Sequence, residues 1–437
     1  MGHFEQFMSA IEQRSAVLGV IGLGYVGLPL AVAKAQAGYQ VIGFDVDEQK
    51  VDSIIEGKSY ISDIDDQELS EQVHSGKLTA TTDFRRLSGV DAVSICVPTP
   101  IDKYKQPDLS YLIAAVESIS QYMKKPILII LSSTTFPGTT TEIAKPILEK
   151  AGAKIGEDVF LAYSPERIDP GNRSFQIKGI PRIVGGTSEH CTKLAARLYE
   201  HVLKEKLFQV DRTEIAEMAK IVENTFRLVN IGLMNELAVL CHRMGLDIWK
   251  VIEAASTKPY GFLPFYPGPG IGGHCIPVDP HYLTWKAKEY HYTSQLIERA
   301  AEINESMPEY VVFRMTMMLN ELQKPMKGAK VLLVGAAYKK NVPDLRESPV
   351  LEIMSLLDRY GVDWEYYDPH VPTMSAVGRK KSSISLTPES VRDFDLVVIT
   401  TDHDQTDYSL LAAEAKVIFD TRNKMEGFSC KGRYYKL

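Results

Sequence analysis

Apolar runs alternate with glycine turns and helical patterns along the first half of the chain. Residues 17–21 form an apolar run, a glycine turn and a helical pattern closed by Gly38 follow, and residues 41–44 form a second run. Further runs in "DAVSICVP", "PILIILSS" and "VFLAYSPE" continue the alternation to about residue 210. Such runs are typical of buried parallel strands. Residues 1–210 are therefore predicted to form a Rossmann-like, doubly wound domain.

The pattern changes at Glu214 and changes back after residue 324. A single helical periodicity continues to Gly245, and a Pro/Gly/aromatic segment and more helix follow it. We expect a central helical domain over residues 211–324. Strand-helix alternation resumes with "AKVLLVGAAYK", "DWEYYDP", "FDLVVITTD" and "AKVIFDTRN" over residues 325–437. The predicted fold class is α/β, with two Rossmann-like doubly wound parallel-sheet domains joined by a central helical domain with one long helix.

Two helices are expected to bury apolar surface in particular ways. The first residues carry an apolar stripe at helical spacing, which predicts a short amphipathic helix and lacks the basic start of a secretory signal: Phe4, Phe7, Met8 and Ile11. The long central helix is apolar on several faces, and such a helix must be covered. We therefore expect a homodimer or higher homo-oligomer.

Composition narrows the classes of function. The 437 residues are 45% hydrophobic and 24% charged, and no apolar run is long enough to span a bilayer. A net charge of −7 argues against a general nucleic-acid footprint. The five cysteines are scattered, without the spacing of a disulfide framework or a zinc site. These features predict a cytoplasmic enzyme with neither a membrane anchor nor a metal.

The motif "GLGYVG" follows the first strand and opens a helix. Gly22 permits a tight turn, Gly24 allows a close approach by a pyrophosphate, and Gly27 lets the helix sit against the strand. Asp45 closes the next strand, where a carboxylate binds the ribose 2′-hydroxyl and repels a 2′-phosphate. A purely structural glycine turn is the alternative. The strand-turn-helix context, with Asp45 in place, favours NAD as the bound dinucleotide. Tyr25 and Val26 also lie in the turn.

Other polar residues stand where chemistry is possible, although each also has an ordinary structural interpretation. Thr99, Thr134 and Glu166 follow predicted strands, and parallel strands present their carboxyl ends to one ligand crevice. Lys220 and Asn224 are four residues apart and so lie on one helix face, which is more often simply solvated. Cys275, in "GIGGHCIPVDP", is either a packed small residue or a nucleophile.

The order of these motifs carries a family resemblance. GLGYVG, CVPTP, SST, SPER, K-x-x-x-N, GGHC-x-x-x-D and K-x-x-x-x-D-x-R-E-S resemble the UDP-glucose/GDP-mannose dehydrogenase family over nearly the whole chain. Within it, "TKPYGFLPFYPGPGIGGHCIPVDPHYLTWKA" is similar to bacterial UDP-N-acetylglucosamine 6-dehydrogenases of O-antigen synthesis. The resemblance implies oxidation of C6 of a UDP-sugar to a carboxylate by two NAD⁺, without a metal, for surface polysaccharide precursors.

The resemblance also implies roles for individual residues. Cys275 would be the thiol nucleophile, Lys220 and Asn224 would stabilise the oxyanion, Asp279 would be a polar partner of the general-base water, and Glu166 and Thr134 would place and activate the hydrolytic water. Cofactor binding would fall to Gly22, Gly24, Tyr25, Val26, Gly27, Asp45, Thr99, Thr134 and Arg346. Substrate binding would fall to Glu166, Arg167, Lys220, Asn224, Arg227, Phe265, Tyr266, Gly272, Lys339 and Arg422, with Lys339 and Arg422 at the UDP end.

One departure from the family bears on the sugar. UDP-glucose members carry an arginine upstream of the glycine-rich turn and a lysine before the aspartate, whereas here "KPYGFLPFYPGPG" and Val278 stand in those places. A wall of aromatic residues and proline suits a 2-acetamido group, so UDP-N-acetylglucosamine is the expected substrate. UDP-GalNAc, UDP-ManNAc and UDP-glucose remain alternatives. A two-electron β-hydroxyacid-type dehydrogenase and a non-catalytic NAD-binding sensor are alternatives of other classes.

Overall fold

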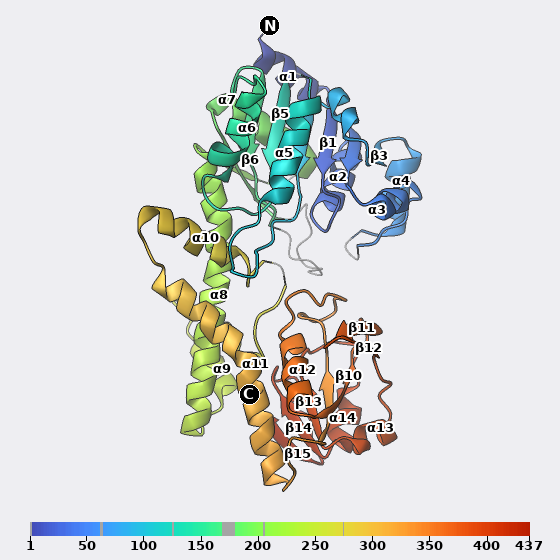
Figure 1. Ribbon diagram of the computed structural model, residues 1–437, viewed down its shortest axis with the longest axis vertical. Helices are drawn as coiled ribbons and strands as arrows, with labels where there is room; N and C mark the ends of the chain where they lie inside the picture. Colours follow the sequence, from blue (N-terminus) through green and yellow to red (C-terminus); the bar gives the residue numbers. More distant parts are fainter. Residues whose placement is uncertain (1, 62–63, 125, 168–179, 204–205, 274) are drawn as a thin grey trace. The chain divides into compact units, whose positions relative to one another are not determined.

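The computed structural model describes the whole chain except residues 1, 62–63, 125, 168–179, 204–205 and 274. The chain divides into two compact units (Figure 1). The first consists of Met1–Glu223 and His281–Tyr290, and the second of Asn224–Pro280 and His291–Leu437. Each unit has its own sheet and its own hydrophobic core.

The sheet of the first unit has eight strands in the order β3-β2-β1-β4-β5-β6-β7-β8. The first six strands of this order repeat the 3-2-1-4-5-6 order of dinucleotide-binding sheets. The strands are β1 (Val17–Ile21), β2 (Gln40–Phe44), β3 (Leu78–Thr81), β4 (Ala92–Ile95), β5 (Ile127–Leu131), β6 (Val159–Tyr163), β7 (Arg182–Gly186) and β8 (Leu207–Val210). All pairs are parallel except β6 with β7.

Helices cover both faces of this sheet (Figure 1). Apolar side chains of α1, α2 and α7 pack on one face and those of α5 and α6 on the other, because alternate residues of buried strands point to opposite faces. The helices are α1 (His3–Glu12), α2 (Gly27–Gln36), α3 (Glu48–Ile55), α4 (Asp66–His74), α5 (Ser110–Tyr122), α6 (Lys145–Lys150) and α7 (Glu189–Leu203). Short turns of helix span Phe84–Gly89, Thr139–Ala144 and Lys288–Tyr290. The amphipathic helix expected at the start of the chain is confirmed: α1 buries Phe7 and Ile11.

The second unit has a parallel five-stranded sheet in the order β10-β9-β13-β14-β15. Its helices α11 and α12 cover one face, and α13 and α14 cover the other. The strands are β9 (Lys330–Val334), β10 (Asp363–Tyr367), β13 (Leu396–Ile399), β14 (Val417–Asp420) and β15 (Arg433–Lys436), with a separate antiparallel hairpin of β11 (Thr373–Ala376) and β12 (Arg379–Ser382). The helices are α11 (Gln295–Glu321), α12 (Pro349–Arg359), α13 (Pro388–Asp393) and α14 (Tyr408–Glu414).

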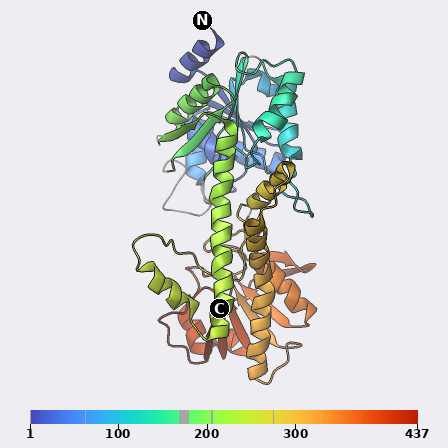
Figure 2. The same cartoon turned by 90° about the vertical axis from the view of Figure 1, so that its left-hand side faces the viewer.

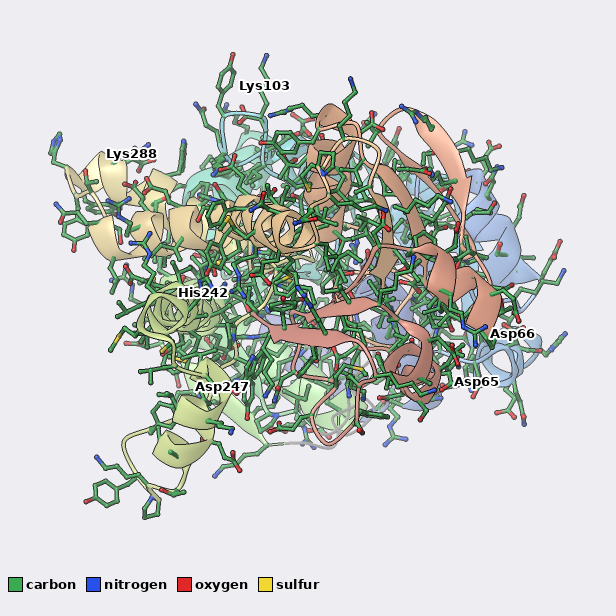
Figure 3. All side chains as sticks on the ribbon, turned by 90° about the horizontal axis from the view of Figure 1, so that it is seen from below. Asp65, Asp66, Lys103, His242, Asp247 and Lys288 are labelled. Carbon is green, nitrogen blue, oxygen red and sulfur yellow. The ribbon has the colours of Figure 1, made fainter. Side chains whose placement is uncertain are left out.

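One long helix, α8 (Thr213–Met244), begins in the first unit and ends in the second. Figure 2 shows it without interruption, as expected from the long periodicity. Gly245, at φ +70°, ends it and α9 (Ile248–Ser256) follows. Asp247, labelled in Figure 3, caps α9 by accepting the Trp249 N–H, and its other oxygen accepts a hydrogen bond from Lys436 on β15. The helix α10 (Asp279–Ala287) crosses between the two units in sequence.

The predicted fold class is confirmed, with one correction. The first sheet is mixed, because β7 runs antiparallel to β6, whereas a parallel sheet was expected to about residue 210. The strands β7 and β8 were not anticipated from the sequence. An arginine and two glycines leave β7 with only two large apolar residues, and β8 is largely exposed, so neither forms the continuous apolar run by which a buried strand is recognised. The three-domain division at residues 210 and 324 stays a prediction.

Candidate active site

The glycine turn after β1 has the geometry that the motif requires. Gly22 adopts φ +87°, and a Cβ on Gly27 would lie 1.7 Å from the carbonyl oxygen of Gly22. Only glycine is possible at these positions, because the turn and the start of α2 touch there. A Cβ on Gly24 would meet nothing within 4 Å. The turn therefore leaves open space at the residue where a pyrophosphate approaches the N-terminus of α2, so a dinucleotide fits.

Asp45, directly after β2, is buried beside this turn. Its Oδ2 accepts the Leu23 N–H at 2.8 Å and its Oδ1 accepts the Asp47 N–H at 3.0 Å. The ammonium of Lys50 lies 3.6 Å from Oδ2. Asp45 is thus held in place at the turn, as expected for a carboxylate that binds a ribose diol. Tyr25 is partly exposed in the turn and Val26 precedes α2.

Three of the predicted residues at strand ends lie on neighbouring strands. Thr99, Thr134 and Glu166 follow β4, β5 and β6, which are adjacent in the sheet. The hydroxyl of Thr99 donates to the Thr134 carbonyl at 2.7 Å. Glu166 is buried and forms an ion pair with Arg182 at the start of β7. Arg167 pairs with Glu223 of α8 at 2.7 Å.

Cys275 is brought together with two other predicted catalytic residues in the second unit. The carbonyl of Cys275 accepts the backbone N–H of Asp279 at 2.8 Å, and the carboxylate of Asp279 accepts a hydrogen bond from the amide of Asn224 on α8. Asp279 and Asn224 are buried, whereas Cys275 is half-buried. Lys220, one helical turn before Asn224, is also buried and belongs to the first unit. The interpretation of Asn224 as a solvated surface residue is therefore wrong.

The glycine-rich loop before Cys275 rests on the C-terminal part of the second unit. A Cβ on Gly272 would lie 2.5 Å from that of Tyr338, and the Gly273 N–H donates to the Arg346 carbonyl at 2.9 Å. A Cβ on Gly268 would lie 2.7 Å from a guanidinium nitrogen of Arg422. Arg422 and Arg346 thus flank the loop that carries the thiol.

The remaining predicted residues are more loosely placed. Phe265 packs edge-on against Phe226 of α8 at 5.6 Å, and Tyr266 stacks on Trp249 of α9 at 5.9 Å. Each ring therefore uses one side to hold the segment before the glycine-rich loop. Arg227 on α8 is exposed, and Lys339 is half-buried next to Tyr338. Asp169, which follows the SPER motif in sequence, lies outside the described residues.

Three residues that organise this region were given no role from the sequence. Asn235 is fully buried on α8 and accepts the Gly268 N–H at 2.9 Å. Glu217, also buried on α8, accepts the N–H groups of Gly138 and Thr140 at 2.6 and 2.9 Å. Burial raises the pKa of Glu217 to about 7, against these hydrogen bonds. The third is Arg182. The only signal for the two α8 residues was a polar side chain within an apolar helix.

The second sheet contains a carboxylate at the position that corresponds to Asp45. Asp368 follows β10 and accepts the N–H groups of Ala336 and Ala337 at 2.7 and 3.0 Å, in the turn after β9. Burial opposes its charge, but hydrogen bonding from His403 and these amides holds the pKa of Asp368 at about 2. The imidazole of His403 is hydrogen-bonded to the carboxylate of Asp368. The turn after β9 therefore does not repeat the arrangement around Asp45.

Fold and turn together define a class, the NAD-dependent oxidoreductases built on a Rossmann-type sheet. Comparison with known proteins identifies the family within this class. The models of the UDP-glucose/GDP-mannose dehydrogenase family match along the chain: the NAD binding domain at residues 16–203, the central domain at 214–306 and the UDP binding domain at 332–427. The chain belongs to the UDP-glucose/GDP-mannose dehydrogenase family.

Individual relatives cover most of the chain. A UDP-N-acetyl-D-glucosamine 6-dehydrogenase of Pseudomonas aeruginosa is 38% identical over 361 residues, 82% of this chain and 84% of that protein. A UDP-N-acetyl-D-mannosamine dehydrogenase of Pyrococcus horikoshii is 36% identical over 88% of this chain and 89% of that protein. A solved structure of the UDP-D-ManNAc dehydrogenase from Pyrococcus horikoshii superposes with a TM-score of 0.88 at 34% identity, covering 96% of this chain and 98% of that one. This chain is thus a nucleotide-sugar dehydrogenase with NAD as its cofactor.

Two features are absent from the part of the chain that the structure describes. No helix there has the length and apolarity needed to cross a membrane. In the same part of the chain, no cluster of three or more His, Cys, Asp or Glu side chains could hold a metal ion.

Proposed function

We propose that this chain oxidises C6 of a UDP-N-acetylhexosamine, most directly UDP-GlcNAc, to the carboxylate in two NAD-dependent steps. The observation that carries the proposal is the contact of Asp279 with both the Cys275 loop and Asn224 of α8, next to residues Arg346 and Arg422, which flank that loop. The cysteine would act at the sugar carbon, and the two arginines belong to the domain whose family model is named for UDP binding.

The proposed chemistry uses the thiol to retain an intermediate. The glycine turn of Gly22, Gly24 and Gly27, with Asp45, would hold NAD⁺, which would supply the hydride acceptor for both oxidations. The thiolate of Cys275 adds to the aldehyde, and the resulting thiohemiacetal is oxidised to a thioester that water hydrolyses. The ammonium of Lys220 and the amide of Asn224, one helical turn apart, would stabilise the oxyanion. Asp279 holds that amide, so its orientation is set before the substrate binds.

The substrate is tested with a panel of UDP-sugars. We expect a kcat/KM for UDP-GlcNAc about ten- to a hundredfold above that for UDP-glucose, because a buried methyl and one satisfied amide hydrogen bond contribute roughly 1 kcal/mol each. The measurement is the initial rate of NADH formation at subsaturating sugar, with two NADH per sugar at completion. Equal or faster use of UDP-glucose would contradict the acetamido assignment.

UDP-ManNAc and UDP-GalNAc belong in the same panel. The names of the Pyrococcus horikoshii relatives support UDP-ManNAc as a second candidate. A preference for either sugar over UDP-GlcNAc would correct the stereochemistry at C2 or C4 and leave the reaction unchanged. One NADH per sugar would favour a two-electron dehydrogenase, and none with any nucleotide sugar would favour a sensor.

We also propose that α8 pairs with α8 of a second copy. Large apolar side chains are exposed along one side of this helix at intervals of seven, seven and four residues: Phe226, Leu233, Leu240 and Met244. An apolar stripe of this kind on a long helix suits a symmetric interface. The resulting homodimer would be the smallest functional assembly.

Charges in this stripe should separate the subunits. We expect Leu233→Glu/Leu240→Glu to shift the mass in solution from at least twice 48.8 kDa towards 48.8 kDa, measured by light scattering after size-exclusion chromatography. The matched control is Glu309→Lys at an exposed position of α11, which should leave the mass unchanged. A monomeric unmodified chain would refute the proposed pairing.

A further inference from the structure

The residue between the first two glycines of the turn, Leu23, is held at both of its backbone polar groups. Its N–H donates to Oδ2 of Asp45 at 2.8 Å, and its carbonyl accepts a hydrogen bond from the hydroxyl of Tyr60 at 2.5 Å. Its side chain is fully buried against β2, where a Cβ on Gly43 would lie 2.8 Å from its Cδ2. Packing and two hydrogen bonds therefore fix the position of Leu23.

The hydrogen bond from Tyr60 fixes a whole peptide group. Because a trans peptide is planar, the carbonyl of Leu23 and the N–H of Gly24 point in opposite directions and can rotate only together. Glycine tolerates positive φ as readily as negative φ, so a peptide that precedes glycine flips at low cost unless it is held. Tyr60 holds the peptide that enters Gly24, the residue with open space for a pyrophosphate.

The surroundings of Tyr60 keep its hydroxyl in the form that donates. Burial raises the pKa of this phenol, and the carboxylates of Asp45 and Asp47 raise it further. The hydroxyl is therefore protonated at neutral pH. The carbonyl of Leu23 accepts its proton, so the hydrogen bond is present over the whole pH range in which the two carboxylates are ionised.

The chain on either side of Tyr60 is anchored to the first unit. The N–H of Ser59 donates to Asp66, labelled in Figure 3 at the start of α4, at 2.7 Å. The hydroxyl of Ser59 donates to the carbonyl of Ile61 at 2.9 Å, and Ile61 is buried in the same core as Leu23. These anchors place Tyr60 at the glycine turn from a position 37 residues away in sequence.

We propose that Tyr60 is a positioning residue of the NAD site, which acts through the carbonyl of Leu23. By fixing the peptide between Leu23 and Gly24, it holds the turn in the conformation that receives the pyrophosphate before the cofactor binds. The free-energy cost of ordering the turn is then met during folding and does not weaken binding. The inference concerns the cofactor alone and makes no assumption about the sugar.

The test is Tyr60→Phe, which removes the hydroxyl and keeps the ring. We expect the dissociation constants for NADH and for ADP-ribose to rise by the same factor, about three- to tenfold, the contribution of one hydrogen bond. ADP-ribose carries the pyrophosphate without the nicotinamide, so it tests the turn by itself. Isothermal titration calorimetry of the full chain without sugar measures both constants. In turnover, the KM for NAD⁺ should rise and kcat should not change.

Two further variants separate positioning from other roles. Tyr39→Phe is the matched control, because Tyr39 lies in the same unit and its hydroxyl also donates to a backbone carbonyl, that of Ile11, at 3.0 Å. Its loss should lower the Tm and leave both dissociation constants unchanged. Tyr60→Leu removes the ring together with the hydroxyl. Its affinities should fall by the same factor as those of Tyr60→Phe, because the hydroxyl carries the effect.

Several results would overturn the positioning role. One is unchanged affinity of Tyr60→Phe, and another is an equal loss in Tyr39→Phe, which would reduce the effect to general destabilisation. A loss confined to Tyr60→Leu would mean that the ring contacts the cofactor directly, and a loss confined to NADH would move the effect to the nicotinamide. A chain that binds NADH but oxidises no UDP-sugar would instead overturn the proposed function and leave this inference in place.

Discussion

Replacement of Cys275 by serine is expected to abolish steady-state oxidation of the UDP-sugar. Loss of a covalent nucleophile commonly costs on the order of 10³-fold or more in kcat, because the remaining groups act only together with it. A serine hydroxyl is far harder to ionise at neutral pH than a thiol, so it does not capture the aldehyde at a useful rate. The measurement is steady-state NADH formation under saturating sugar and NAD⁺.

The chain contains a matched control for this substitution. Cys430 is also half-buried and also belongs to the second unit, but it lies in the segment before β15. Cys430→Ser should therefore keep the turnover of the unmodified chain. Near-normal turnover of Cys275→Ser would show that the reaction does not pass through a thioester.

The second large effect is expected at the cofactor. Asp45→Ala should raise the KM for NAD⁺ on the order of tenfold to a hundredfold, since hydrogen bonds to a charged group contribute about 1.5–3 kcal/mol each. It should also relax discrimination against NADP⁺. The ammonium of Lys50, now 3.6 Å from the carboxylate, would then be available to a 2′-phosphate. Steady-state kinetics with both cofactors measures the change.

Asp47→Ala is the control for this variant. Asp47 lies two residues further on and caps α3 by accepting the Gln49 N–H at 3.0 Å, so its loss disturbs the same part of the fold. Its kinetic parameters for NAD⁺ and NADP⁺ should remain close to those of the unmodified chain. A preference of the unmodified chain for NADP⁺ would mean that Asp45 does not contact the ribose as proposed.

Local patterns were sufficient for the elements that carry most of the fold. An apolar run bounded by glycine predicts a buried strand, and a periodicity that extends from Glu214 to Gly245 predicts one helix, because both depend on neighbours in sequence. The observed helix, Thr213–Met244, differs by one residue at each end. The glycine turn was predictable for the same reason, since its three glycines act within six consecutive residues. The antiparallel β7 was not, because strand direction depends on how a connection is routed.

For the candidate site, too, the sequence determined one part and the tertiary structure another. The sequence by itself determined which residue types could act, namely a thiol in a glycine-rich turn, an ammonium and an amide one helical turn apart, and carboxylates after strands. Only the tertiary structure decided which groups orient them. Asn224 is held by Asp279, 55 residues away, and Glu166 by Arg182 across a strand pair. No local pattern distinguishes such partners from solvated side chains, because burial and hydrogen bonding between distant segments exist only after the chain has folded.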